Sequence, residues 1–264
     1  MVKQTNFESL NGKSCIVTGS ARGIGQGIGD RLIASGASVA FVDVNAEGAE
    51  AAAAAHGDNA IGVGCDVVDR GQVQGMVKKV VAAFGKIDVM YNNAGVNHQQ
   101  RFMETTEENW HRLMDINALS VLIVTQEVSK QMIDQGHGGK IVNTASLAGR
   151  QAYPDIVPYC ASKFAVIAIT QASARYLAEH GIQVNGFSPG VVHTPLWDQL
   201  DRESIEMGNT KEPGEAMAGF AAGALVGRVS TPDDITGLAL FLASSESDYM
   251  TGQTIGVDGG MYIY

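Results

Sequence analysis

Tyr159 and Lys163 are two residues whose types and spacing could handle a proton. Val157 opens an apolar, alanine-rich segment with a helical pattern, and Pro158 suits its first turn because the missing N–H is not needed there. Side chains four residues apart lie one turn above the other on the same helix face. A phenol beside an ammonium can act as an acid–base pair, although the same spacing is common in exposed surface pairs. What the chain places around this pair therefore decides its role.

A glycine-rich turn near the N-terminus predicts a phosphate-binding site. The short apolar strand 15–18 runs into Gly-Ser-Ala-Arg-Gly-Ile-Gly, and a helical pattern follows until Gly36. Glycines let backbone N–H groups approach a pyrophosphate, and the start of a helix favours negative charge. The candidate ligands in this turn are Gly19, Arg22, Gly23, Ile24 and Gly25.

The acidic residue near the end of the next strand bears on the choice of dinucleotide. Asp43 follows the glycine turn at the distance at which an acid hydrogen-bonds an adenosine ribose and repels a 2′-phosphate. Val44 beside it offers no base to that phosphate, so NAD is favoured over NADP. Arg22 is the opposing signal, because a base in the glycine turn could face a 2′-phosphate.

A third strand over 61–65 leads to Asp66 and Val67. An aspartate there could accept a hydrogen bond from an adenine amino group, or it could cap the helix that begins near Asp69. The fourth strand, over 87–91, runs into a group of small residues, Asn93, Ala94 and Gly95. Small residues at a strand's carboxyl end suit the crevice in which open α/β sheets bind ligands.

Two polar residues stand at notable places before Tyr159. Asn117 interrupts the apolar pattern of a long predicted helix over about 107–134. It is either a satisfied buried amide or a residue that bends the helix or binds a water. Ser146 ends the fifth strand, over 140–145, directly before the segment that leads to Tyr159.

Six or seven short apolar strands alternate with helices along the whole chain. This alternation predicts an α/β protein with a single doubly wound parallel sheet, and one domain over residues 1–264 without a linker. Residues 191–225 are polar and weakly periodic, which indicates a mobile helical lid over a site. A further helix is predicted to begin with Thr231 as its cap and Pro232 at its first position.

Composition narrows the class of partner and the compartment. The formal charge of −10 over 264 residues argues against a nucleic-acid partner, whose phosphates need a basic surface. Cys15, Cys65 and Cys160 form neither a disulfide framework nor a zinc pattern, which favours a reducing cytoplasm and predicts no metal. Residues 1–6 lack the apolar segment of a signal peptide, and no unbroken run of 18 apolar residues predicts a membrane span.

The motifs together resemble those of the short-chain dehydrogenase/reductase family, over essentially the whole chain. They occur in the family's order: Thr18-Gly19-x-x-x-Gly23-Ile24-Gly25, Asn92-Asn93-Ala94-Gly95, Asn117, Ser146, Tyr159-x-x-x-Lys163 and Pro189-Gly190. The resemblance implies a Rossmann-type fold and a nicotinamide cofactor. Its implied cofactor ligands, besides those given above, are Tyr159, Lys163, Pro189, Gly190, Val192 and Thr194.

The resemblance also implies a catalytic tetrad. Tyr159 would be the general acid/base, Lys163 its electrostatic activator and a ribose ligand, Ser146 a donor to the substrate oxygen, and Asn117 the holder of a relay water. A free tyrosine has a pKa of about 10, so a base near neutral pH needs roughly 3–4 kcal/mol of preference for the phenolate. One ammonium at an effective dielectric constant near 20 can supply roughly that.

The residues around the tetrad indicate a hydroxylated, water-soluble substrate. The substrate candidates are Ser146, Ala148, Gln151, Tyr153, Tyr159 and Trp197. His98, His193 and Asp198 either join this pocket or face solvent.

Two stretches are similar to bacterial sorbitol and galactitol dehydrogenases: Ser146-x-Ala148-Gly149-Arg150 and Gly190-Val191-Val192-His193-Thr194-Pro195-Leu196-Trp197-Asp198. This resemblance implies oxidation of a sugar alcohol to a ketose. Acetoin or 2,3-butanediol dehydrogenases are the alternative. A 3-oxoacyl-thioester reductase fits less well because such enzymes usually prefer NADPH, and a non-catalytic dinucleotide sensor fits less well because the tetrad is complete. The family is commonly tetrameric, through helices near 107–134 and 157–180 and the C-terminal strand, and the apolar end 261–264 could be buried there.

Overall fold

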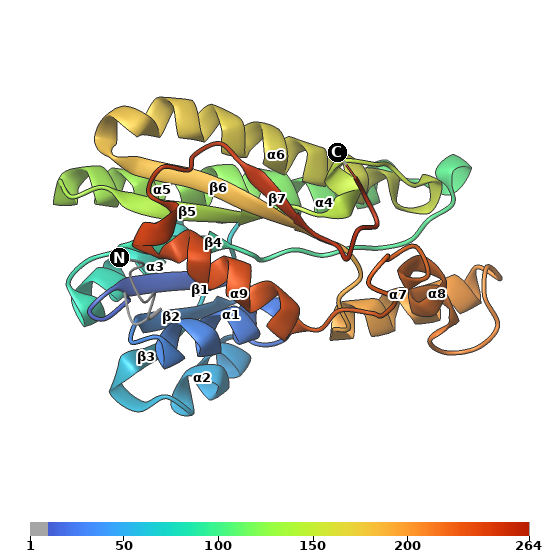
Figure 1. Cartoon of the computed structure of the whole chain (residues 1–264), viewed down its shortest axis with the longest axis horizontal. Coiled ribbons are helices and arrows are strands. Elements are labelled where there is room, and N and C mark those ends of the chain that lie inside the picture. The colour runs from blue at the N-terminus through green and yellow to red at the C-terminus, as the bar shows by residue number, and fades with distance from the viewer. Residues whose placement is uncertain (1–9, 264) are drawn as a thin grey trace, which may run out of the picture.

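The computed structural model describes residues 10–263, and one parallel sheet forms its centre (Figure 1). The segment 1–6 and Tyr264, on which two sequence predictions bear, lie outside the described residues. The sheet order is β3-β2-β1-β4-β5-β6-β7, and every neighbouring pair is parallel. The strands are β1 Ser14–Thr18, β2 Ser38–Asp43, β3 Ala60–Gly64, β4 Val89–Asn92, β5 Gly139–Thr144, β6 Ile182–Pro189 and β7 Thr254–Val257. The predicted doubly wound sheet is confirmed.

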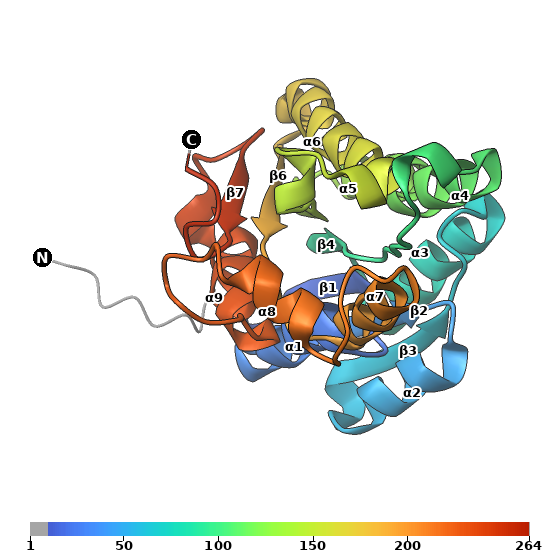
Figure 2. The same ribbon diagram turned by 90° about the vertical axis from the view of Figure 1, so that its right-hand side faces the viewer.

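Helices cover both faces of this sheet (Figures 1 and 2). They are α1 Gly23–Ala34, α2 Ala46–Ala54, α3 Arg70–Phe84, α4 Glu107–Met114, α5 Ser120–Gln135, α6 Val157–Leu177, α7 Pro195–Glu206, α8 Glu215–Ala221 and α9 Pro232–Ala243. Helices α1, α2 and α9 pack on one face, and α3, α5 and α6 pack on the other. Helices α7 and α8 stand apart from both layers, at the end of the molecule where the strands finish.

The core follows from the two-residue period of the strands. In β1, Ile16 packs with α3 and α5, whereas its neighbours Cys15 and Val17 pack with α1 and α9 on the opposite face. Because both faces are covered, all five residues of β1 are buried. Such strands read as unbroken apolar runs, which is why the sequence revealed them.

The order of the strands fixes where a ligand can bind. Successive strands leave β1 in one direction through β2 and β3, and in the other through β4 to β7. The connections after β1 and β4 therefore diverge and leave a crevice at the carboxyl ends of these two strands. Helices α7 and α8 stand beyond this edge, where the polar segment 191–225 was expected to form a lid.

Some local predictions need correction, and others are confirmed. The predicted helix 107–134 is interrupted by a π-helical turn, Asp115–Leu119, which contains Asn117. Asp69, and not Asp66, caps α3 by accepting hydrogen bonds from two backbone N–H groups of its first turn. Helix α9 begins as predicted, with a capping box between Thr231 and Asp234 and proline in its first turn.

Helix α6 and its flanks bear on the membrane prediction. Segment Pro154–His180 is long and apolar enough to cross a membrane, by length and composition only, with a mean hydropathy of 1.2. Its Lys163 is nevertheless buried against the end of β5, and Ala174 and Leu177 belong to the core shared with the sheet. A core helix of an α/β protein meets the same composition criterion.

Candidate active site

The glycine turn after β1 has the shape of a phosphate cradle. Gly19 and Gly23 have φ values of 64° and 63°, which glycine adopts without strain. A Cβ at Gly25 would lie 2.3 Å from the carbonyl oxygen of Gly19, so only glycine fits there. Helix α1 begins at this turn without a side-chain cap, which leaves its first N–H groups free to face an anion. These features fit the pyrophosphate of a dinucleotide.

Asp43 is anchored at the edge of this turn. Its carboxylate accepts hydrogen bonds from the backbone N–H of Ala21 at 3.1 Å and of Asn45 at 3.0 Å. Val44 beside it is 76% exposed and carries no charge. The edge of the turn thus holds one fixed negative charge close to the start of α1.

Asp66 and Val67 lie one strand further out. Gly64, at the end of β3, pairs with Asp43 at the end of β2, so the segment that follows borders the same crevice. One carboxylate oxygen of Asp66 accepts from the N–H of Val68 at 3.1 Å. The capping alternative for Asp66 is excluded because Asp69 caps α3, and the other carboxylate oxygen of Asp66 has no hydrogen bond within residues 10–263.

Asn93 joins the end of β4 to the glycine turn. Its side-chain amide donates to the carbonyl oxygens of Thr18 at 3.0 Å and Gly19 at 3.2 Å. The hydroxyl of Thr18 accepts from the backbone N–H groups of Asn93 and Ala94. These bonds fix the width of the crevice between β1 and β4.

Ser146 lies directly beyond β5 and presents its hydroxyl to the phenol of Tyr159. The Oγ atom of Ser146 accepts a hydrogen bond from the N–H of Ala148 at 3.1 Å, so its own proton is free for another acceptor. Burial raises the pKa of Tyr159, and the hydrogen bond with Ser146 opposes that rise. In the protein alone the phenol therefore keeps its proton at neutral pH and is ready to donate it.

Lys163 lies one turn after Tyr159 on α6, with 4% of its surface exposed. Its Nζ donates to the carbonyl oxygen of Thr144 at 2.8 Å and lies 5.6 Å from the centre of the Tyr159 ring. Burial lowers the pKa of Lys163 to about 8. The expected lowering of the Tyr159 pKa by this ammonium is not seen: burial raises the pKa, and Ser146, not Lys163, is the group that opposes the rise.

Asn117 is fully buried in the π-helical turn, and both the oxygen and the nitrogen of its side-chain amide form hydrogen bonds. Its Oδ1 accepts from the N–H of Val96 at 2.8 Å, and its Nδ2 donates to the carbonyl of Val96 at 2.9 Å and to Ser162 Oγ at 3.1 Å. The side chain thus holds the loop after β4 against α6. Both hydrogens of Nδ2 are committed, so a relay water at this side chain would have to donate to Oδ1, which still has one lone pair.

A cleft of about 220 Å³ joins these parts at the carboxyl edge of the sheet. It brings together most of the predicted cofactor ligands: Gly19, Arg22, Gly23, Ile24, Gly25, Asn93, Gly95, Tyr159, Lys163, Pro189, Gly190, Val192 and Thr194. Asp43, Asp66, Val67 and Ala94 border the crevice without lining this cleft. Ser146 also lines it, so the glycine turn and the Tyr159–Lys163 pair border the same cleft.

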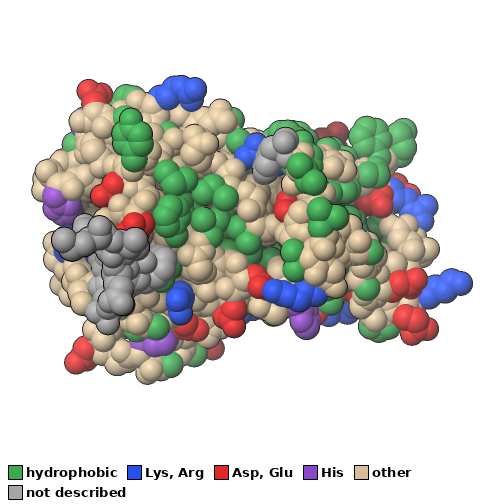
Figure 3. Space-filling model, viewed as in Figure 1, with side chains coloured by type: hydrophobic (Ala, Val, Ile, Leu, Met, Phe, Trp, Pro, Cys, Tyr) green, Lys and Arg blue, Asp and Glu red, His purple; other side chains and the backbone are tan. Residues whose placement is uncertain are grey.

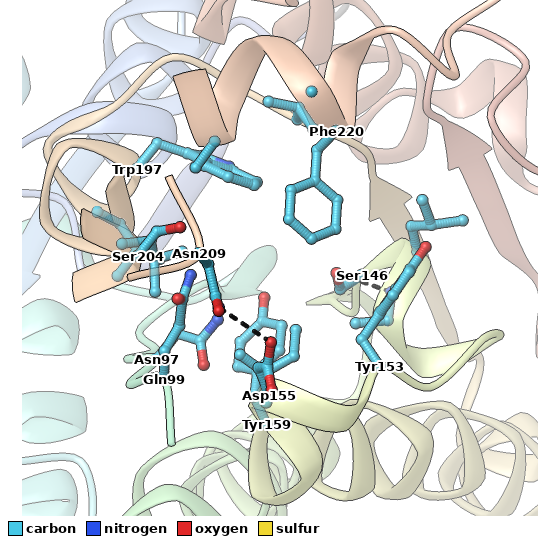
Figure 4. Close-up of a pocket in the computed structure, with 18 of the residues that line it drawn as sticks. Asn97, Gln99, Ser146, Tyr153, Asp155, Tyr159, Trp197, Ser204, Asn209 and Phe220 are labelled. Atoms are coloured by element: carbon cyan, nitrogen blue, oxygen red, sulfur yellow. Dashed lines mark hydrogen bonds between the residues drawn. The ribbon is translucent and has the colours of Figure 1, made fainter. Parts of the chain in front are cut away.

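A larger cavity of about 590 Å³ opens on the other side of Ser146 and Tyr159, below α7 and α8 (Figure 4). Phe220 forms its roof and makes edge contacts with Tyr153 and Trp197, with ring centres 5.7 and 5.6 Å apart. Ala148 also lines this cavity, so five of the six predicted substrate residues meet there. The sixth, Gln151, is exposed and lies outside the lining.

The three ambiguous residues lie outside the cavity. His193 and Asp198 are more than half exposed and approach each other to 3.7 Å. The ring of His98 points to Glu203 on α7, at 2.8 Å. The polar lining residues that sequence reasoning missed come instead from Asn97, Gln99, Asp155, Ser204, Asn209, Thr210 and Glu215. The polar run directly after Gly95 was the available signal for the first two.

Comparison with known proteins identifies the family. A family model described as enoyl-(acyl carrier protein) reductase matches residues 19–262. A solved short-chain type dehydrogenase/reductase from Mycobacterium marinum has a TM-score of 0.88 and 33% identity, covering 98% of this chain and 99% of that one. The chain belongs to the short-chain dehydrogenase/reductase family. The family implies a nicotinamide dinucleotide cofactor, which the glycine cradle fits.

Curated relatives in this family act on alcohols and ketones. The galactitol 2-dehydrogenase of Agrobacterium fabrum is 43% identical, over 96% of this chain and 99% of the relative. The sorbitol dehydrogenase of Cereibacter sphaeroides is 40% identical, over 96% of this chain and 99% of the relative. The L-2,3-butanediol dehydrogenase of Corynebacterium glutamicum is 38% identical, over 94% of this chain and 98% of the relative. This chain is therefore an alcohol oxidoreductase.

Proposed function

We propose that the chain oxidises a secondary alcohol of a sugar alcohol to a ketose with NAD. The observation that carries this proposal is the cavity beside Ser146 and Tyr159, whose aromatic roof faces a polar wall. Such a cavity matches a flexible carbon chain that bears several hydroxyl groups. The galactitol and sorbitol dehydrogenases among the relatives support the same class.

In this reaction the alcohol loses a hydride from carbon and a proton from oxygen. The bound nicotinamide supplies the hydride acceptor. The Ser146 hydroxyl donates a hydrogen bond to the substrate oxygen, and the deprotonated Tyr159 takes the proton from it. Lys163 favours the phenolate electrostatically, and Asn117 keeps the loop after β4 in place against α6.

NAD is the proposed form of the cofactor. The carboxylate of Asp43 is fixed by two backbone N–H groups at the edge of the cradle, where a ribose diol can donate to it and a 2′-phosphate is repelled. Val44 adds no positive charge there. Arg22 lines the cleft beside Gly23 and Thr194, and we assign it to the pyrophosphate.

A vicinal diol or acetoin is the second candidate substrate, because the butanediol dehydrogenase relative covers the chain almost as fully. The formation of reduced cofactor, measured by absorbance at 340 nm, distinguishes the two candidate substrates. Hexitols, tetritols and 2,3-butanediol are each assayed with NAD and with NADP in parallel. We expect the highest kcat/KM for a hexitol with NAD. Tight NAD binding without turnover of any alcohol would sink the proposal and favour a dinucleotide sensor.

We also propose a homotetramer in the cytoplasm. Apolar side chains gather over β7 and the neighbouring α9 (Figure 3), and β7 is an edge strand. On α6, Phe164 and Tyr176 are 46% and 70% exposed, as expected of a face that a second copy covers. The cysteines are free and buried, in keeping with a reducing compartment. Light scattering of the purified protein measures the assembly.

A further inference from the structure

Asn97 and Gln99 carry side-chain amides that the protein leaves partly or wholly without hydrogen bonds. Asn97 is 3% exposed, and its Oδ1 accepts a hydrogen bond from the N–H of His98 at 2.8 Å. A backbone N–H can only donate, so the accepting atom is the oxygen and the NH₂ group points elsewhere. Within residues 10–263, neither this NH₂ group nor the side-chain amide of Gln99 has a hydrogen-bond partner, and both residues line the large cavity.

The other polar groups of the cavity are mostly committed to one another. Asn209 donates to the carboxylate of Asp155 at 3.2 Å. Thr210 donates to the hydroxyl of Ser204 at 3.1 Å. The amides of Asn97 and Gln99 are accessible from the cavity and are not sealed in the core, so a ligand or water in the cavity can bind them.

Glu203 and Gln199 on α7 hold the backbone segment that carries the two amides. The carboxylate of Glu203 accepts from the N–H of Gln99 at 2.9 Å and from the ring nitrogen of His98 at 2.8 Å. Gln199, one turn earlier on α7, donates to the same carboxylate at 2.7 Å and to the carbonyl of Asn97 at 3.2 Å. Helix α7 thus holds the backbone of residues 97–99 by hydrogen bonds, and the side chains of Asn97 and Gln99 line the cavity.

The amides lie away from the end of the cavity that holds Tyr153. Figure 4 shows Asn97 and Gln99 on one side, Ser146 and Tyr153 on the other, and the phenol of Tyr159 between them. A substrate whose reacting carbon lies at Ser146 and Tyr159 must extend across the cavity to reach the amides. A chain that ends in methyl groups next to the reacting diol gains nothing from them.

We propose that Asn97 and Gln99 form a subsite for the hydroxyl groups of a polyol beyond its reacting carbon. Glu203 is the positioning residue that fixes this subsite. The inference rests on the proposed function and sharpens it, because it explains how the chain would prefer a sugar alcohol to a short diol. Amides suit hydroxyl groups, since each can donate to and accept from them without a charge.

The test compares kcat and KM for a hexitol and for 2,3-butanediol, with NAD saturating. Asn97→Asp keeps the accepting oxygen and removes the donor, and Gln99→Ala removes an uncommitted side chain. Each is expected to raise KM for the hexitol roughly tenfold, the effect of one lost hydrogen bond, and to leave the kinetics of the diol within twofold. Glu203→Ala should reproduce this pattern, and Glu203→Gln, which keeps an acceptor, should restore most of the hexitol affinity.

Asn59→Ala is the matched control, an exposed amide at the opposite edge of the sheet that should change neither substrate. The inference is overturned if hexitol and diol kinetics fall together, or if both stay unchanged in Asn97→Asp and Gln99→Ala. A wild-type enzyme that turns over neither substrate would instead reject the proposed function itself. Equal melting temperatures of Gln99→Ala and the wild type would show that the change in KM does not come from misfolding.

Discussion

Lys163 donates a hydrogen bond from Nζ to the carbonyl oxygen of Thr144 at 2.8 Å, at a place where the lysine is 4% exposed. No carboxylate within residues 10–263 pairs with this ammonium. Burial lowers its pKa from 10.5 to about 8. The cation is therefore held at a cost in stability, which is a pattern expected where a charge serves catalysis.

Replacing Lys163 with methionine should abolish most activity and stabilise the fold at neutral pH. Since the unfolded lysine binds its proton more tightly than the folded one, the charge costs about 3 kcal/mol below pH 8. The variant also loses the hydrogen bond to Thr144, which costs about 1–2 kcal/mol of stability. The net gain in unfolding free energy is therefore about 1–2 kcal/mol. The wild type regains stability as pH rises from about 8 towards 10.5, so the advantage of the variant shrinks there.

Urea unfolding of wild type and Lys163→Met at pH 7 and pH 10 measures this difference. We expect kcat to fall at least about 100-fold, because the proton-handling pair loses its cation. Lys163→Arg is the control that keeps a charge but cannot lose it in this range. A methionine variant that is less stable than the wild type at pH 7 would contradict the assigned cost.

The raised pKa of Tyr159 gives the two directions of the reaction opposite pH profiles. Alcohol oxidation needs the phenolate, so its rate should rise with pH as the phenol loses its proton. Ketone reduction needs the protonated phenol, so its rate should be flat near neutral pH and fall in alkali. Initial rates in both directions between pH 6 and 10 test this, and Tyr159→Phe should remove both profiles along with turnover.

The sequence was sufficient for the sheet because β1 and its neighbours are buried on both faces and read as unbroken apolar runs. The proposed catalytic residues were also predictable, because Ser146 follows the end of β5 by two residues and Tyr159 precedes Lys163 by one helical turn. These relationships are local in the chain. They need no knowledge of how distant segments meet.

The substrate cavity could not be predicted in the same way. Asn97 and Gln99 are held at the cavity by residues of α7 more than a hundred positions later: Gln199 donates to the carbonyl of Asn97, and Glu203 accepts from the N–H of Gln99. Gln151, close to Ser146 in sequence, turns to solvent instead. The π-helical turn at Asn117 likewise depends on bonds to Val96 that no periodicity reveals. Long-range polar contacts therefore set the part of the site that we propose to select the substrate.

Gly25→Ala should destroy cofactor binding. An alanine Cβ would lie 2.3 Å from the carbonyl oxygen of Gly19 and 2.6 Å from Nδ2 of Asn93, so the cradle must shift. We expect a loss of about 1–3 kcal/mol in unfolding free energy and at least a 100-fold weaker affinity for NAD. Gly75→Ala on α3 is the matched control, since nothing lies within 4 Å of its Cβ and alanine should stabilise the helix by up to about 1 kcal/mol. Calorimetric titration with NAD that finds both variants equal would refute the cradle.

The choice between NAD and NADP should turn on Asp43 and Val44. A carboxylate and a 2′-phosphate about 4 Å apart repel by about 4 kcal/mol at an effective dielectric constant near 20, which corresponds to roughly 10³ in affinity. The double variant Asp43→Ser, Val44→Arg removes this repulsion and adds a base at an exposed position. The ratio of kcat/KM for NADP to that for NAD should rise at least about 100-fold.

The variant Arg22→Ala in the same assay tests the role of Arg22. If Arg22 binds the pyrophosphate, its loss should weaken the binding of NAD and of NADP equally. If Arg22→Ala instead lowered only the activity with NADP, the assignment of this arginine to the pyrophosphate would be wrong.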